Sequence, residues 1–216
     1  MSDVLYRLSN VTQCYGGKTV LDISDFSVSK GAIVGLAGHN GSGKSTMMRM
    51  LAFLESPASG KIYYDGKLVD IADTKLRREV SLLTQEPYLL KRTVAGNVAY
   101  GLELRGADNI ESTVRDSLNM VGLDPDLFMS RHWYELSGGE AQRVAFAARL
   151  AINPRVMLLD EPTASLDRES TLLIREAATT VRDKCGTTLV IVSHDQTWLE
   201  EVSDVIFRFS MGKIKE

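Results

Sequence analysis

The order of an apolar run, a glycine-rich loop and an amphipathic stretch constrains the fold of this 216-residue chain most strongly. Residues 33–37 are apolar or glycine throughout, which is typical of a strand buried on both faces. Beyond the loop, apolar side chains between Met47 and Leu51 recur at the spacing of a helix face, which predicts a helix over residues 44–54. A strand that continues through glycines into a helix is typical of α/β folds.

The loop has the composition of a phosphate-binding loop. It fits the pattern G-x-x-x-x-G-K-[ST] and consists of Gly38, His39, Asn40, Gly41, Ser42, Gly43, Lys44, Ser45 and Thr46. Glycines allow successive backbone N–H groups to curl around an anion that meets a helix N-terminus. The ammonium of Lys44 suits the β- and γ-phosphates of a nucleotide, and the Ser45 hydroxyl suits Mg²⁺. The alternative is a chance match in a glycine-rich turn, which the flanking strand and helix disfavour.

A second predicted strand ends in two carboxylates. The apolar run 156–159 is typical of a buried parallel strand, and Asp160 and Glu161 follow it directly. Ligands of an open α/β sheet bind at the carboxyl ends of its strands, so we expect both side chains beside the phosphate loop. Asp160 would hold Mg²⁺ through water, and Glu161 would act as general base on an attacking water. The alternative is the acidic N-terminus of a helix.

Helical and apolar segments alternate in the last third of the chain. Residues 139–152 and 169–183 are predicted helices, and residues 189–192 form a further apolar run. This alternation predicts the α/β fold class with a doubly wound, mainly parallel sheet. The first third is β-rich, with strands predicted over 4–8, 19–23, 26–28 and 61–64, and is expected to form an antiparallel β subdomain.

The chain is predicted to be a single domain, 1–216. Residues 1–86 and 150–216 are expected to form the core with the β subdomain. Residues 87–149 are expected to form an inserted helical subdomain, whose clearest helix covers 112–121.

Composition excludes several classes of protein. Lys and Arg number 25 against 28 Asp and Glu, so the net charge of -3 provides no basic field, and we expect no nucleic-acid partner. The longest stretch without a charged residue, 31–43, is too short to span a bilayer, and the first residues do not resemble a secretory signal. The two cysteines are expected to be reduced thiols of a cytoplasmic protein, with Cys14 packed.

The segment Leu-Ser-Gly-Gly-Glu-Ala-Gln-Arg at 136–143, together with the elements above, resembles the signature of ATP-binding cassette (ABC) ATPases. A serine and two glycines at a helix start form a second anion cradle. The alternative is a capping box made by Ser137 and Glu140. The resemblance implies a P-loop NTPase core that hydrolyses ATP with Mg²⁺. It also implies that Ser137, Gly138 and Gly139 contact ATP bound by the opposite subunit of a head-to-tail homodimer or paired cassette.

Four more roles follow from the resemblance. Gln85 would reach Mg²⁺ and the attacking water, Asp167 would contact the partner cassette, His194 would contact the γ-phosphate, and Tyr15 would stack on adenine. Their alternatives are a solvated glutamine, a helix cap, a surface histidine and a turn tyrosine. The sequence has His39 where many members have proline, and Glu140 where many have glutamine; His39 is expected to have no catalytic role.

The resemblance also implies partners. One uninterrupted cassette indicates a transporter subunit at the cytoplasmic face of the membrane, with separate transmembrane permease subunits and a solute-binding protein. Residues 85–90 and 93–98 resemble the importer segment that receives a coupling helix, and residues 38–40 and 53–55 resemble those of tungstate-type oxyanion importers. The alternatives are a lipid or lipoprotein export cassette, a non-transport ABC ATPase, or a nucleotide kinase or GTPase that shares only the phosphate loop.

Overall fold

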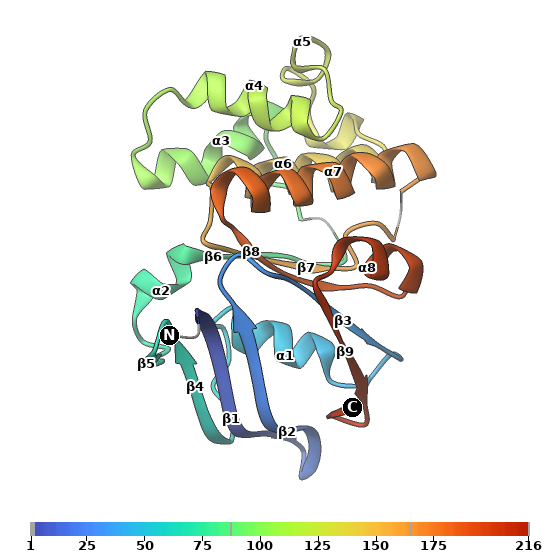
Figure 1. The fold of residues 1–216 in the computed structure, drawn as a ribbon. Coiled ribbons are helices and arrows are strands. Elements are labelled where there is room, and N and C mark those ends of the chain that lie inside the picture. The colour runs from blue at the N-terminus through green and yellow to red at the C-terminus, as the bar shows by residue number, and fades with distance from the viewer. Residues whose placement is uncertain (1–2, 87, 165, 216) are drawn as a thin grey trace.

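The computed structural model describes residues 3–86, 88–164 and 166–215 and contains two sheets and a group of helices (Figure 1). The strands are β1 (Val4–Tyr15), β2 (Lys18–Ser29), β3 (Ile33–Gly38), β4 (Ser59–Tyr64), β5 (Lys67–Leu68), β6 (Val80–Leu83), β7 (Val156–Asp160), β8 (Thr188–Val192), β9 (Val205–Ser210) and β10 (Lys213–Lys215). The helices are α1 (Lys44–Leu51), α2 (Thr74–Glu79), α3 (Val94–Arg105), α4 (Ile110–Met120), α5 (Pro125–Phe128), α6 (Gly138–Ala151), α7 (Arg168–Cys185) and α8 (Gln196–Val202).

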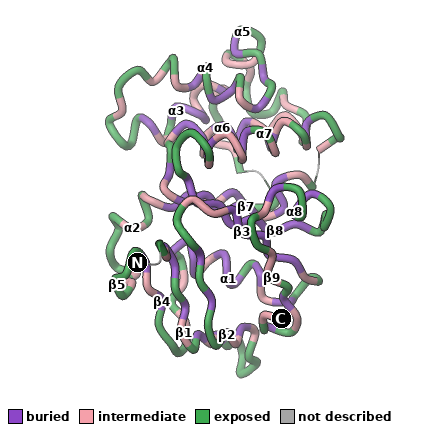
Figure 2. The backbone as a smooth tube through the Cα atoms, viewed as in Figure 1, coloured by how far each residue is buried: buried purple, intermediate pink, exposed green. Residues whose placement is uncertain are grey.

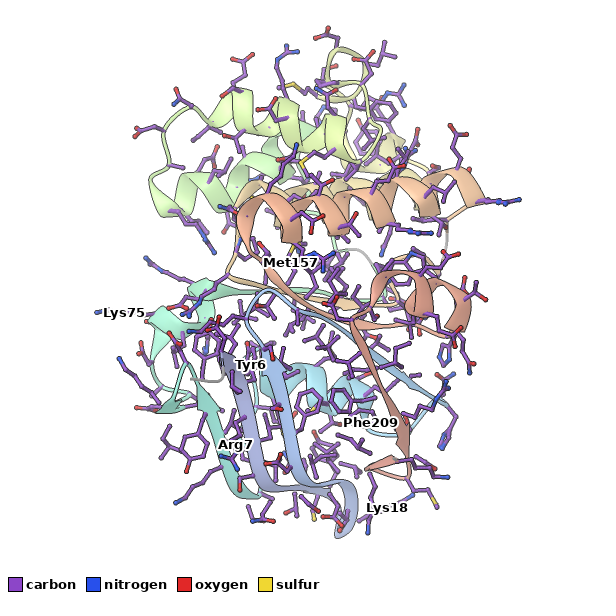
Figure 3. The ribbon with its side chains drawn as sticks, in the orientation of Figure 1. Tyr6, Arg7, Lys18, Lys75, Met157 and Phe209 are labelled. Carbon is purple, nitrogen blue, oxygen red and sulfur yellow. The ribbon has the colours of Figure 1, made fainter. Side chains whose placement is uncertain are left out.

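The central sheet has the strand order β10-β9-β3-β8-β7-β6, in which β9 and β10 pair antiparallel and the other described neighbours pair parallel. Its inner strands are buried on both faces, which explains their continuous apolar runs (Figure 2). Along β7, Val156 and Leu158 pack in the cluster on the α1 side, whereas Met157 and Leu159 pack under the helices. Figure 3 shows Met157 between the sheet and α7. The predicted doubly wound sheet is confirmed.

The second sheet is antiparallel, with the order β2-β1-β4-β5, and lies at the bottom of Figure 1. The predicted strands at 19–23 and 26–28 are one strand, because β2 runs without a break from Lys18 to Ser29 and Asp25 pairs with Ser9 of β1. Lys18 stands at the tip of this hairpin (Figure 3). The prediction for Cys14 was wrong: its side chain is exposed near the end of β1.

The helices above the central sheet begin and end near the predicted residues. α4 covers 110–120, and α6 extends to Ala151, so the predicted boundary between 149 and 150 falls in the last turn of α6. The helix predicted over 44–54 ends earlier, at Leu51, because Phe53 has a φ of 56°. Within the described residues, no helix is long and apolar enough to cross a membrane.

Candidate nucleotide-binding site

The phosphate-binding loop connects β3 to α1, and two of its glycines lie against neighbouring backbone that a side chain would strike. Gly38 has a φ of 150°, and a Cβ there would collide with the carbonyl oxygen of Phe209 on β9, which Figure 3 shows near the C-terminal end of the chain. Gly43 has a φ of 104°, and a Cβ there would lie 2.8 Å from the carbonyl oxygen of Val20. The sequence pattern requires these glycines, and the tertiary structure shows that the neighbouring backbone excludes any side chain.

Lys44 is buried at the start of α1. Its Nζ donates to the carbonyl oxygens of Gly38, at 2.7 Å, and His39, at 3.0 Å. Burial lowers the pKa of its ammonium, while the carboxylates of Glu161 and Asp160 oppose that shift. The side chain is therefore held inside the loop, where a bound phosphate would supply a stronger partner than the two carbonyls.

Asp160 ends β7 and pairs in register with Val192 of β8. Its Oδ2 accepts a hydrogen bond from Ser45 Oγ at 3.4 Å, which brings the two predicted metal-binding oxygens together. Burial raises the pKa of Asp160, and the hydroxyl of Ser45 and the charge of Lys44 oppose that shift. These are hard oxygen donors of the kind that Mg²⁺ uses together with phosphate oxygens.

Glu161 lies just beyond β7 and is only 7% exposed. Its φ is 50°, and its N–H donates to the carbonyl oxygen of Val192 at 2.9 Å, so the backbone turns toward the end of β8. Oε2 accepts from the backbone N–H of His194 at 3.3 Å. Burial raises the pKa of Glu161, the His194 contacts lower it, and the charge of Asp160 raises it further. A carboxylate with a raised pKa is a stronger base than an ordinary glutamate.

His194 follows β8 and is exposed at the mouth of the site. Its Nε2 lies 2.9 Å from Asn40 Oδ1 in the phosphate-binding loop and 3.4 Å from Glu161 Oε1. The contact with Asn40 joins residues 154 positions apart, and no local sequence signal predicts it. His194 therefore lies between the loop and the buried carboxylate, where it can contact a terminal phosphate.

A single pocket collects most of the predicted residues and has a volume of about 250 Å³. It is lined by Tyr15, Val20, Asn40, Gly41, Ser42, Gly43, Lys44, Ser45, Thr46, Gln85, Asp160, Glu161, Val192 and His194. Gly38 and His39 do not line it, and their backbone carbonyls hold Lys44 instead. Val20 was missed, since an apolar strand residue carries no sign of its role.

The Ser137–Gly139 segment does not line this pocket. Ser137 caps α6: its hydroxyl accepts from the N–H of Glu140 at 3.3 Å, and the Glu140 carboxylate accepts from the N–H of Ser137 at 2.7 Å. The capping box is therefore present, and the exposed helix start remains open, since a Cβ on Gly138 would meet no atom of the described residues within 4 Å. Asp167 caps α7 by accepting from the N–H of Ser170 at 2.7 Å, and Ser165 lies outside the described residues.

A metal ion at this site would depend on the nucleotide for part of its coordination. The described part of the chain holds no group of three or more His, Cys, Asp or Glu side chains suited to a metal. Ser45 and Asp160 are in contact, and Gln85, in the loop after β6, lines the same pocket. This sparse set of oxygen donors fits Mg²⁺, which usually retains water and phosphate oxygens among its ligands.

Comparison with known proteins agrees with this geometry. The family described as "ABC transporter" matches residues 21–164. The chain is 36% identical to the tungstate uptake system ATP-binding protein TupC of Peptoclostridium acidaminophilum, over 97% of this chain and 96% of that protein. It is also 36% identical to the Fe(3+) ions import ATP-binding protein FbpC of Pasteurella multocida, over 97% of this chain but only 60% of that longer protein.

Solved structures extend the likeness to the whole fold. A dimeric ATP-binding cassette in a post-hydrolysis state, bound to ADP and Pi, has a TM-score of 0.89 at 29% identity, covering 98% of this chain and 97% of that one. The cbiO1 protein of Clostridium perfringens, part of an ABC transporter complex, also has a TM-score of 0.89 at 27% identity, covering 99% and 88%. Together with the phosphate-binding loop, the carboxylates of Asp160 and Glu161 and the signature segment, these matches show that the chain belongs to the ABC transporter family of ATP-binding, ATP-hydrolysing cassettes.

Proposed function

We propose that two copies of this chain bind two ATP molecules head to tail and power solute import through separate membrane permease subunits. The observation that carries the proposal is the separation of the two anion-binding elements. Ser137, Gly138 and Gly139 lie at an open helix start outside the pocket that contains Lys44 and Glu161. A second copy would place its own open helix start against the ATP of the first. The dimeric form of the similar ADP-bound cassette supports this arrangement.

Hydrolysis then follows from the positions of the side chains. Lys44 Nζ leaves the loop carbonyls for the β- and γ-phosphates, and Glu161 takes a proton from a water whose oxygen bonds to the γ-phosphorus. The bond from that phosphorus to the bridging oxygen breaks, which releases ADP and phosphate. His194 and the partner's signature helix stabilise the terminal phosphate. Mg²⁺, held by Ser45, Gln85 and Asp160, would neutralise phosphate charge.

The permease would dock in a groove between β6, α2, α3 and α6. Four arginines line it, namely Arg77, Arg78, Arg105 and Arg149. Among the described residues none of the four has a carboxylate oxygen within the 4.0 Å limit of an ion pair. Burial lowers the pKa of Arg149, and burial and the charge of Arg78 lower that of Arg105. A cytoplasmic helix of the permease with at least one carboxylate would complement the positive charge of this groove.

The proposed solute is an oxyanion such as tungstate, delivered by a solute-binding protein, and the chain would act at the cytoplasmic face of the membrane. The support is the tungstate relative, which this chain matches over nearly its full length. The iron-import relative supports import but is named for another solute, and this chain matches only 60% of its length. The alternative outside import is a free-standing lipid or lipoprotein export cassette.

Reconstitution tests both parts of the proposal. The chain is combined in lipid vesicles with a permease and a solute-binding protein of the tungstate type, and ATP hydrolysis is measured with tungstate, sulfate, Fe³⁺ or no solute. Tungstate-stimulated hydrolysis together with uptake is expected, and uptake with Fe³⁺ alone would contradict the oxyanion proposal.

Arg105→Glu should abolish co-purification with the permease, whereas the control Arg7→Glu, which alters an arginine on β1, should retain it.

A further inference from the structure

A hydrogen-bonded cluster surrounds the aromatic residue at one end of the nucleotide pocket. Tyr15 lines the pocket at the end of β1, and its side chain is 44% exposed. Its hydroxyl donates to the carboxylate of Glu55, which lies in the segment after α1. We call Gln13, Tyr15, Arg49 and Glu55 the Glu55 cluster. The ring that is proposed to stack on adenine is therefore held in place through its hydroxyl group.

Arg49 connects this cluster to the phosphate-binding loop. Its Nε donates to Glu55 Oε2 at 2.9 Å, and its Nη2 donates to Tyr15 Oη at 3.1 Å. The same Nη2 donates to Thr46 Oγ1 at 3.2 Å, and Thr46 is buried in the first turn of α1. The aromatic ring and the phosphate-binding helix thus share one guanidinium, which fixes the distance between the two parts of the pocket.

Gln13 also donates to Glu55, at the oxygen Oε1 that accepts from Tyr15. Its Nε2 donates to the Glu55 carboxylate and, at 3.2 Å, to the carbonyl oxygen of Ser56, and its Oε1 accepts from the N–H of Ala58 at 3.0 Å. Burial alone would raise the pKa of Glu55, but the hydrogen bonds from Tyr15, Arg49 and Gln13 keep it below its ordinary value. Glu55 is therefore an ionised acceptor held by groups from β1 and α1.

We propose that Glu55 is a positioning residue for nucleotide binding: it fixes the Tyr15 ring at the distance from the phosphate-binding loop that the adenine base of a bound nucleotide requires. The inference rests on the proposed stacking of Tyr15 on adenine. A half-exposed tyrosine beside a hairpin tip would otherwise lose rotamer freedom on binding, and a ring ordered in advance avoids that cost. Glu55 should therefore act on the affinity for the base and leave phosphate chemistry unchanged.

The test compares Glu55→Ala, Tyr15→Phe and the double variant in steady-state ATP hydrolysis. Each single variant should raise the KM for ATP about threefold to tenfold, which is the net contribution of one typical hydrogen bond. The kcat should stay within about twofold, because Glu161 and Lys44 are untouched. The double variant should be no worse than the worse single variant, because the proposal assigns the effect of each to the one hydrogen bond that both remove, between Tyr15 and Glu55. Inhibition by Mg²⁺-tripolyphosphate, which has no base, should be unchanged.

Three results would overturn the inference. Additive effects in the double variant would show that Glu55 acts without the tyrosine hydroxyl. An equal loss of tripolyphosphate inhibition would show that Glu55 supports the phosphate-binding loop. An unchanged KM in Tyr15→Ala would show that the ring does not hold the base, while ATP hydrolysis by Lys44 and Glu161 would stand.

Glu55→Gln, which keeps an acceptor oxygen, should recover part of the affinity. Glu111→Ala, which removes a surface carboxylate paired with Arg115, is the matched control and should leave KM unchanged. Thermal unfolding of each variant separates loss of affinity from loss of fold. Because Tyr15→Phe removes one oxygen from an exposed ring, it keeps the test valid even where Glu55→Ala is unstable.

Discussion

Replacing Glu161 by glutamine should abolish hydrolysis while making the nucleotide-free protein more stable. The wild-type carboxylate is 7% exposed, and its Oε1 has no hydrogen-bond partner among the described residues, although His194 Nε2 lies 3.4 Å away. Glutamine has nearly the same shape, can still accept the N–H of His194 through its carbonyl oxygen, and carries no charge to desolvate. The buried charge is thus a cost that the active site carries for function.

The magnitude follows from the cost of one buried polar group without a full set of partners. We expect about 1 kcal/mol of added stability. For a chain of this length that corresponds to a rise in Tm of about 2–4 °C. Loss of the general base should lower kcat by about a hundredfold to ten-thousandfold. ATP-bound dimers should accumulate, because binding is intact and turnover is not.

The pH dependence gives a second, independent check. The pKa of Glu161 is raised in the folded state above its ordinary value of 4.5. The protonated, uncharged carboxyl of Glu161 therefore makes its full contribution to stability below the pKa that it has in the unfolded chain. That contribution is lost as the pH rises through the pKa that it has in the folded protein. The Tm advantage of the glutamine variant should be largest near pH 7 and should disappear toward pH 4.

Differential scanning calorimetry of both proteins from pH 4 to pH 8, together with a phosphate-release assay and gel filtration with ATP, tests these expectations. As the pH is lowered, the kcat/KM of the wild type should begin to fall at a pH above 4.5, because only the ionised carboxylate acts as base. A glutamine variant that is less stable at pH 7, or whose Tm difference does not change with pH, would refute the reasoning. Unchanged steady-state hydrolysis would refute the assignment of Glu161 as general base.

Three further changes test other parts of the site. Lys44→Ala should weaken ATP binding by at least about tenfold in a nucleotide titration, because a charge-assisted contact is lost, and retained tight binding would contradict its phosphate role. Ser137→Arg should allow ATP binding but prevent hydrolysis, since the arginine would block the second copy's nucleotide, and normal activity would exclude a composite site. Gly38→Ala should destabilise the fold by about 2 kcal/mol or more through collision with Phe209, whereas Gly138→Ala, with open space around it, should lower Tm little.

Much of the candidate site could be predicted because its signals are local. The phosphate-binding loop, the carboxylates after β7 and the signature serine each occupy a few consecutive residues, and their spacing carries their chemistry. The rule that ligands bind at the carboxyl ends of parallel strands predicts Asp160 and Glu161 beside the loop, and both side chains line the same pocket as the loop. The continuous β2 was predicted as two strands, because the polar Ser24 and Asp25 resemble a turn.

The sequence by itself determined the α/β class, the phosphate-binding loop and the family, since apolar periodicity and short motifs act over one or two elements. Only the tertiary structure decided which distant groups meet. It placed His194 against Asn40, Glu55 against Tyr15, and the carbonyl oxygen of Phe209 where a Cβ on Gly38 would lie. It also set the positive φ of Glu161. These features depend on the register of the strands and the packing of both sheets around α1, and such long-range constraints leave no periodic mark on the chain.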